Sequence, residues 1–158
     1  SKIIKFFKLK DISKILEIGC AKGFILDEFL KKKMNVYGVD VSSYAVKKSL
    51  ITVKKKIILK NLSKNKFFKD NYFDFIISKE VIPHLSKTEI KQLIMNINAI
   101  SKDHKKIYFI IQVPSMIKYK KNFKNWDVTH KSIMTKIEWI NFLEKNKFKG
   151  KVAFKELV

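Results

Sequence analysis

Arginine is absent from this sequence, and the residues that shape turns and cross-links are scarce. The 158 residues include one cysteine, two prolines and four glycines. The single cysteine, Cys20, cannot form an internal disulfide, which agrees with a reducing compartment. No apolar run approaches the roughly 18 residues of a membrane span, and lysines interrupt segment 1–8 too often for a signal peptide. These absences predict a cytoplasmic protein that makes no membrane contact.

The missing arginine also bears on the positive charge. Lysine supplies all 35 basic side chains against 14 acidic ones, for a formal net charge of +21. Such a charge suggests a polyanion partner, because lysines that neutralise phosphates release counterions. However, arginine is best suited to bidentate phosphate and guanine contacts, and the lysines are spread through the chain. The pattern favours a general lysine bias, with nucleic acid as an alternative partner.

Apolar runs alternate with amphipathic segments along the chain, without an internal repeat or a linker, so residues 1–158 are expected to form one domain. Strands are expected at residues 14–19, 35–40, 56–60, 72–78, 106–112 and 152–158. Helices are expected from residue 21 to about residue 33 and from Ser42 or Ser43 to about residue 50. Two more are expected after the capping-box patterns Ser86 to Glu89 and Thr135 to Glu138, where apolar residues recur at helical intervals as far as Ile100 and Leu143. The alternation predicts an α/β fold: a Rossmann-like, doubly wound, mostly parallel sheet of about six strands with helices on both faces.

The stretch from Ile15 to Asp40 has the layout of a nucleotide-type cofactor site. A buried strand leads to Gly19, a tight turn follows as far as Gly23, and a second strand ends in the carboxylate of Asp40. Glycines let the backbone approach a ligand closely, and a carboxylate at that strand end can accept hydrogen bonds from both ribose hydroxyls. The arrangement predicts an adenosine-containing cofactor.

Two residues argue against a dinucleotide. The fingerprint Gly-x-Gly-x-x-Gly would need glycine where the sequence has Ala21 and Phe24. A phenylalanine there would obstruct the close approach of helix and strand, so NAD is disfavoured.

The segment Glu17-Ile18-Gly19-Cys20-Ala21-Lys22-Gly23 instead resembles motif I of the class I S-adenosylmethionine-dependent methyltransferases, with Ala21 replacing the central glycine. Gly38-Val39-Asp40-Val41-Ser42 is similar to the second motif of that family, and Asn61-Leu62 falls where adenine-contacting residues come. Residues 73–85 resemble the strand-four signature, and the block from Trp126 to His130 is similar to one seen in many small-molecule members. The resemblance covers about residues 14–150.

The resemblance implies S-adenosylmethionine as cofactor and a set of residues that bind it. The turn of motif I would lie against the methionine part, with Glu17 near the amino group and Ser78 offering a backbone carbonyl to it. Asp40 would hold the ribose, Val41 would pack on the adenine, and Asn61 would meet its polar edge. The implied cofactor-binding residues are Glu17, Gly19, Cys20, Ala21, Gly23, Asp40, Val41, Asn61, Leu62 and Ser78.

Three residues are candidate catalytic groups: His84, His130 and Glu80. Imidazole titrates near neutral pH, and a base is needed only if the acceptor must lose a proton. The alternative is that His84 caps a loop, His130 packs, and Glu80 lines the pocket. Cys20 is interpreted as a small turn residue rather than a nucleophile.

Glu80 to His84 also resembles the Glu-x-x-Glu-His ligand set of metal-dependent oxygen methyltransferases, with His130 as a possible extra ligand. Pro83 removes one carboxylate from that set, which a hard divalent ion would need. We therefore predict no metal.

The long loop at residues 113–131 and the Trp126 block favour a small-molecule acceptor. The lysines of that loop, interleaved with Tyr119, could contact an anionic acceptor or simply be solvated. An RNA methyltransferase and a catalytically silent cofactor-binding or scaffold domain are the alternatives. The family usually has a seventh, antiparallel strand between the fifth and sixth, which this sequence lacks. We expect an exposed groove beside residues 152–158, or a homodimer that fills it.

Overall fold

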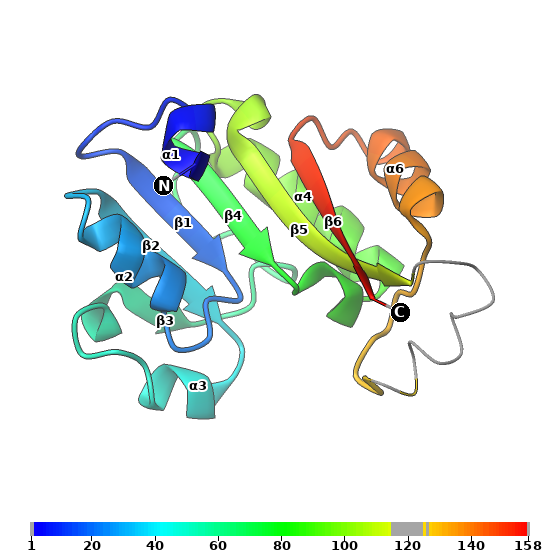
Figure 1. The fold of residues 1–158 in the computed structure, drawn as a ribbon, viewed down its shortest axis with the longest axis horizontal. Helices are drawn as coiled ribbons and strands as arrows, with labels where there is room; N and C mark the ends of the chain where they lie inside the picture. Colours follow the sequence, from blue (N-terminus) through cyan, green and yellow to red (C-terminus); the bar gives the residue numbers. More distant parts are fainter. Residues whose placement is uncertain (1, 115–124, 126, 158) are drawn as a thin grey trace.

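A computed structural model describes residues 2–114, 125 and 127–157. Its centre is one six-stranded, wholly parallel sheet in the order β3-β2-β1-β4-β5-β6 (Figure 1). The strands are β1 Lys14–Ile18, β2 Asn35–Asp40, β3 Ile57–Leu59, β4 Phe75–Lys79, β5 Ile107–Pro114 and β6 Lys151–Leu157. The predicted α/β class, the parallel sheet and the number of strands are confirmed.

Helices cover both faces of the sheet, as predicted. Figure 1 shows α1 and α2 in front of the sheet and α4 behind it. The helices are α1 Lys2–Phe6, α2 Phe24–Leu30, α3 Ser43–Lys47, α4 Lys87–Ile100 and α6 Lys136–Lys145, with 3₁₀ turns at Lys54–Lys56, Ile82–His84 and His104–Lys106. None of the helices in the described part of the chain has the length and apolar character that crossing a bilayer requires.

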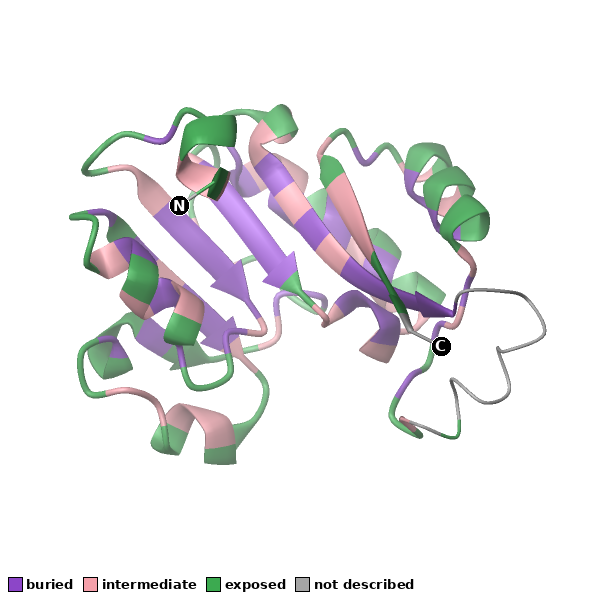
Figure 2. Ribbon diagram, viewed as in Figure 1, coloured by how far each residue is buried: buried purple, intermediate pink, exposed green. Residues whose placement is uncertain are grey.

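Each face of the sheet has its own apolar core. Side chains of a strand alternate between the faces, so Ile15 of β1 joins the cluster under α2, and Leu16 joins the cluster under α4. In β4, Phe75 and Ile77 likewise lie on one side and Ile76 on the other. Central strands buried on both faces read as continuous apolar runs, which explains why these two could be found from the sequence (Figure 2).

Several boundaries differ from the predictions for local reasons. Helix α2 begins at Phe24 rather than at residue 21, because Ala21 and Gly23 have left-handed φ angles of 46° and 81°. Strand β4 begins at Phe75 rather than at residue 72, because the backbone N–H of Tyr72 donates to Ile100 at the end of α4 instead of to the sheet. Both capping boxes are confirmed, at the starts of α4 and α6.

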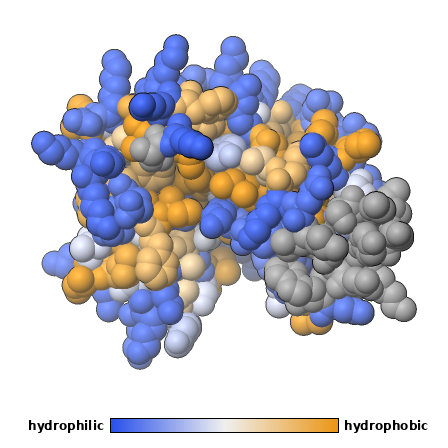
Figure 3. All heavy atoms as spheres, in the orientation of Figure 1, coloured by the Kyte–Doolittle hydropathy of each residue, from blue (hydrophilic) through white to orange (hydrophobic). Residues whose placement is uncertain are grey.

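The gap expected between the last strand and the strand before it is wrong, whereas the homodimer stays a prediction. β6 pairs directly with β5 over seven residue pairs, from Tyr108 opposite Lys151 to Pro114 opposite Leu157. β6 thus occupies the place beside β5 that the resemblance reserves for a seventh strand. The outer edge of β6 forms the end of the sheet. The face of the molecule that Figure 3 shows exposes apolar patches among hydrophilic side chains.

Candidate active site

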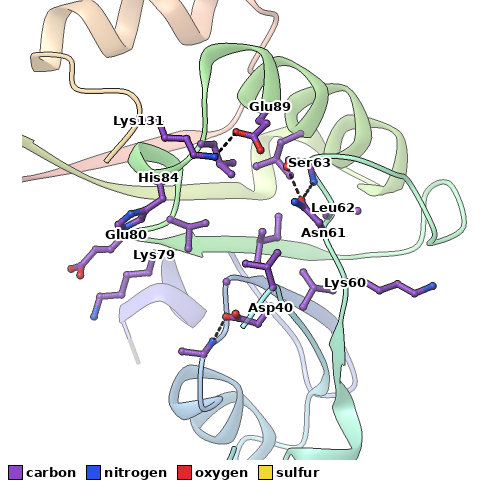
Figure 4. A pocket seen from close by; sticks show the side chains of 18 residues that line it. Asp40, Lys60, Asn61, Leu62, Ser63, Lys79, Glu80, His84, Glu89 and Lys131 are labelled. Carbon is purple, nitrogen blue, oxygen red and sulfur yellow. Dashed lines mark hydrogen bonds and ion pairs between the residues drawn. The ribbon is translucent and has the colours of Figure 1, made fainter. Parts of the chain in front are cut away.

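A cavity of about 490 Å³ opens at the carboxyl ends of β1, β2 and β4. This is where ligands bind in open α/β sheets, and the volume is within the usual range of roughly 300–1,000 Å³ for ligand pockets. Figure 4 shows Asp40 on one side of the cavity and Glu89 with Lys131 on the opposite side. The lining residues are Ile18, Gly19, Ala21, Val39, Asp40, Val41, Lys60, Asn61, Leu62, Ser63, Lys79, Glu80, Val81, His84, Leu85, Glu89, Leu93 and Lys131.

The turn after β1 can be built only with a glycine at its start. Gly19 has a φ of +69°, and a Cβ added there would lie 2.1 Å from Cγ2 of Val81. The N–H groups of Gly19 and Cys20 both donate to the carbonyl of Val39, at 2.8 and 3.2 Å. The turn is therefore tied to β2 and packed against the segment that follows β4.

Asp40 connects the end of β2 to this turn. Its Oδ2 accepts a hydrogen bond from the Ala21 N–H at 2.7 Å, and its Oδ1 accepts one from the Ser42 N–H at 2.8 Å. A carboxylate oxygen has two lone pairs, so each oxygen can accept a further hydrogen bond from the cavity. Ala21 keeps a left-handed φ despite its Cβ, which is the conformation that the replaced glycine would adopt more easily.

The third wall of the cavity follows β3. Oδ1 of Asn61 accepts hydrogen bonds from the Ser63 N–H at 2.9 Å and the Ser63 hydroxyl at 2.6 Å, so this oxygen is engaged locally. The Leu62 carbonyl accepts from Nδ2 of the buried Asn96 at 2.7 Å. These bonds fix the loop. The apolar side chains of Leu62 and Val41 line the cavity, where they can pack against a planar ring of a ligand.

Glu17 is buried in β1 and is not among the residues that line the cavity. Burial raises the pKa of its carboxyl to about 8, with a smaller opposing effect from a hydrogen bond to the Leu26 backbone. Within the described residues its Oε2 has no hydrogen-bond partner. Glu17 is thus a neutral acid at the pH where an exposed glutamate is ionised.

Three further residues of the implied cofactor set lie behind the cavity wall rather than on it. Cys20 is buried, and burial raises the pKa of its thiol to about 12, which leaves no thiolate to act as a nucleophile. Gly23 packs where a Cβ would lie 2.6 Å from Val53. Ser78 is fully buried, and its hydroxyl donates to the Ile18 carbonyl at 3.3 Å.

The candidate catalytic residues lie at the end of the cavity beyond β4. Glu80 and His84 line it, whereas His130 is buried beside His84, with their ring centroids 4.6 Å apart. Glu80 has a φ of 59°, and its Oε1 accepts from Nζ of Lys155 at 3.1 Å. The two histidines come together because the N–H groups of residues 131 and 132 both donate to the Pro83 carbonyl at 2.9 Å.

The sequence profile of the methyltransferase domain family matches residues 1–150. The chain belongs to this family. A search of curated protein sequences finds no match to this methyltransferase domain.

Solved structures share the fold of the domain. A Methanosarcina mazei SAM-dependent methyltransferase has a TM-score of 0.75 at 19% identity, over 93% of this chain and 84% of that one. A Bacillus halodurans protein assigned as a methyltransferase has a TM-score of 0.76 at 15% identity, with 92% and 66% covered. A SAM-dependent methyltransferase of Archaeoglobus fulgidus has a TM-score of 0.71 at 20% identity, with 92% and 64% covered. The domain therefore spans about two thirds of the length of the last two.

Sequence reasoning missed several residues that face the cavity. Glu89 was identified only as a helix cap, yet it lines the cavity, and its Oε2 lies 3.3 Å from Nζ of Lys131. Lys60 and Ser63 lie outside the recognised motifs, and Lys79 lies within the strand-four signature but had no role assigned to it. Tyr119, Trp126 and the four loop lysines at positions 118, 120, 121 and 124 lie outside the described residues, so their predicted contact with an acceptor stays a prediction.

Proposed function

We propose that this domain is an S-adenosylmethionine-dependent methyltransferase that acts on a small-molecule acceptor. The observation that carries the proposal is the Asp40 carboxylate at the end of β2, facing a cavity whose floor is the Gly19 to Ala21 turn. Family membership supplies the reaction class, and the cavity supplies a site with the chemistry of an adenosine-containing ligand.

The residues present fit the cofactor. The positive-φ turn at Gly19 and Ala21 would adjoin the methionine part, Asp40 would accept hydrogen bonds from the ribose, and Val41 with Leu62 would enclose the adenine. When bound, S-adenosylmethionine supplies an electrophilic methyl group on a sulfonium. Glu17, Cys20, Gly23 and Ser78 would support this site from behind its wall.

The work left to the chain is to orient the acceptor and exclude water, since methyl transfer is an in-line displacement. Glu80, His84, Glu89 and Lys131 surround the end of the cavity away from Asp40, so this end would hold the acceptor. His84 is the cavity-lining residue suited to hold or receive a proton of the acceptor, and His130 would position it from behind. The block from Trp126 to His130, which resembles one seen in small-molecule methyltransferases, favours a small acceptor over RNA.

Titration calorimetry with S-adenosylmethionine and S-adenosylhomocysteine tests the cofactor. We expect both to bind the unmodified chain and Asp40→Asn to bind about 10- to 100-fold more weakly, as the loss of hydrogen bonds to a charged acceptor predicts. Asp70→Asn is the control, because Asp70 is exposed, pairs with Lys66 and does not line the cavity. Thermal unfolding of each variant separates lost affinity from lost fold. No binding of either compound by the unmodified chain would refute the proposal.

The acceptor is tested by incubating the protein and labelled cofactor with a metabolite extract or with total RNA. Label transfer to a small molecule supports the proposal. Transfer to RNA, with a strongly salt-dependent affinity, would establish the RNA alternative suggested by the charge of +21. Cofactor binding without transfer to either would favour a catalytically silent domain.

A further inference from the structure

Among the described residues, one group of side chains has the composition of a metal site. His84, Asp127 and His130 each offer one ligand atom, and the three atoms lie within 4.8 Å of one another. Oδ2 of Asp127 is 3.7 Å from Nε2 of His130 and 4.0 Å from Nε2 of His84. His84 ends the 3₁₀ turn Ile82–His84, whereas the other two precede α6, so the group is assembled only by folding.

A hydrogen-bonded chain through Thr129 orients His84. The Thr129 hydroxyl donates to Oδ1 of Asp127 at 2.5 Å, and this uses its only proton. The hydroxyl oxygen of Thr129 also lies 2.8 Å from Nδ1 of His84. Since its proton is already used, this oxygen must accept a hydrogen bond from Nδ1. Neutral His84 therefore carries its proton on Nδ1 and presents the lone pair of Nε2. Fixing one ring nitrogen so that the other can coordinate is the usual arrangement of histidine ligands.

The charges of the other two groups suit a cation. Hydrogen bonds from Thr129 hold the pKa of Asp127 below its ordinary value, so this carboxylate is ionised. Burial and the neighbouring His84 lower the pKa of His130, which favours its neutral form. Nε2 of His84, which carries no proton in this tautomer, lies 4.0 Å from Oδ2 of Asp127. Binding of one cation to both atoms would need the ring of His84 to turn toward the carboxylate.

We propose that His84, Asp127 and His130 bind a divalent transition-metal ion of the Zn²⁺ type. Two neutral imidazoles and one carboxylate are a ligand set that such ions favour, with a position left open. Ligand bonds of about 2.0–2.2 Å place ligand atoms roughly 3.3 Å apart in tetrahedral geometry. The separations of 3.7 and 4.0 Å would need to shorten by less than about 1 Å, and the longest separation in the group, up to 4.8 Å, by as much as about 1.5 Å.

The two segments are already held together without an ion. The carbonyl of Pro83 accepts from the N–H groups of Lys131 and Ser132 at 2.9 Å, and the hydroxyl of Ser132 donates to the Leu85 carbonyl at 2.7 Å. His130 is only 4% exposed. The ligands therefore sit on fixed backbone, which lowers the conformational cost of binding.

The site lies where an acceptor would meet it. His84 lines the cavity, and Asp127 and His130 adjoin His84 without lining the cavity, so an ion held by the three would lie beside the cavity at His84. A coordinated oxygen, nitrogen or sulfur of the acceptor would have a lowered pKa and a fixed orientation. With the ion bound, His84 would be a ligand and not the base, because both of its ring nitrogens are engaged. This role rests on the proposed function; the metal site does not. The carboxylate that the Pro83 position lacks is supplied by Asp127, and Glu80 is paired with Lys155 instead.

Metal binding is measured directly, on protein prepared without a histidine tag and freed of metal with a chelator. Co²⁺ is titrated by visible absorption and Zn²⁺ by calorimetry, with Mg²⁺ for comparison. We expect one Zn²⁺ per chain at micromolar affinity or tighter, weaker Mg²⁺ binding, and at least tenfold weaker Zn²⁺ binding for His84→Ala and Asp127→Asn. His104→Ala is the matched control, because His104 contacts the Asn98 carbonyl and is the one histidine outside the group.

Circular dichroism checks that both partly exposed variants fold, and the buried His130 is left unchanged for that reason. No Zn²⁺ binding by the unmodified chain, or equal binding by the His84 and Asp127 variants, would overturn the proposal. The same samples are titrated with S-adenosylhomocysteine. If S-adenosylhomocysteine binds and Zn²⁺ does not, only the metal site is refuted. If Zn²⁺ binds and S-adenosylhomocysteine does not, only the cofactor proposal is refuted.

Discussion

At the scale of single residues, Glu17 shows how burial changes a side chain that sequence reasoning assigned to the cofactor. Its carboxyl has lost its hydration within β1, and burial raises its pKa from 4.5 to about 8. An unfolded Glu17 releases its proton near pH 4.5, so between these pH values the folded state binds more protons than the unfolded state. The contribution of Glu17 to stability is therefore lost as pH rises through this window.

Glu17→Gln should remove this pH dependence, because glutamine keeps the shape and stays neutral. We expect the free energy of unfolding of the native chain, relative to Glu17→Gln, to fall by a few kcal/mol, an order-of-magnitude figure, from pH 5 to pH 8. Urea unfolding at both pH values measures it. Comparing the two proteins at each pH cancels the titration of every other group. A constant difference between them would contradict the raised pKa.

At the scale of elements, the capping boxes determine where the two long helices begin. The Ser86 hydroxyl accepts from the Glu89 N–H at 3.2 Å, and Oε2 of Glu89 accepts from the Ser86 N–H at 2.8 Å. These bonds satisfy donors that the first turn of α4 would leave free. Because Glu89 also lines the cavity, the cap connects the start of α4 to the proposed acceptor end.

Ser86→Ala should destabilise the fold by about 1 kcal/mol, the usual cost of losing an N-cap hydroxyl. Thr88→Ala is the control, since it removes a hydroxyl from an exposed position of the same helical turn. Chemical denaturation of the three proteins gives the comparison. Equal losses for both variants would mean that the capping hydrogen bond adds nothing to stability.

At the scale of the whole molecule, charge is the dominant feature. A net charge of +21 on 158 residues repels itself, and the lysines extend along the whole sequence. Among the lysines that the structure describes, few form ion pairs such as that of Lys102 with Asp74. Salt screens charges separated by more than about 10 Å at 0.1 M, so it should relieve the repulsion.

We expect the melting temperature to rise by roughly 2–4 °C between 10 and 200 mM NaCl, which corresponds to a gain of about 1 kcal/mol. Scanning calorimetry measures it, and a neutral solute at matched osmolality serves as the control. A melting temperature that falls with salt would show that local ion pairs outweigh the net repulsion.

The sequence by itself determined the features that depend on neighbours along the chain. Apolar runs with strand and helix periods predicted the sheet, and short-range hydrogen-bonding patterns predicted the caps of α4 and α6. The turn from Gly19 to Gly23 could be recognised because its glycines adopt positive φ angles, and Asp40 because it ends a strand. These features need no knowledge of what packs against them.

Only the tertiary structure decided the features that depend on distant neighbours. Pairing of β6 with β5 is set by packing across the sheet, which no short pattern encodes. Burial separated Glu17 and Ser78 from the cavity that Gly19 and Asp40 line. The approach of Asp127 and His130 to the turn ending at residue 84 depends on hydrogen bonds to the Pro83 carbonyl. Burial and long-range contact are properties of the folded chain, so the composition of the site could be read only from the fold.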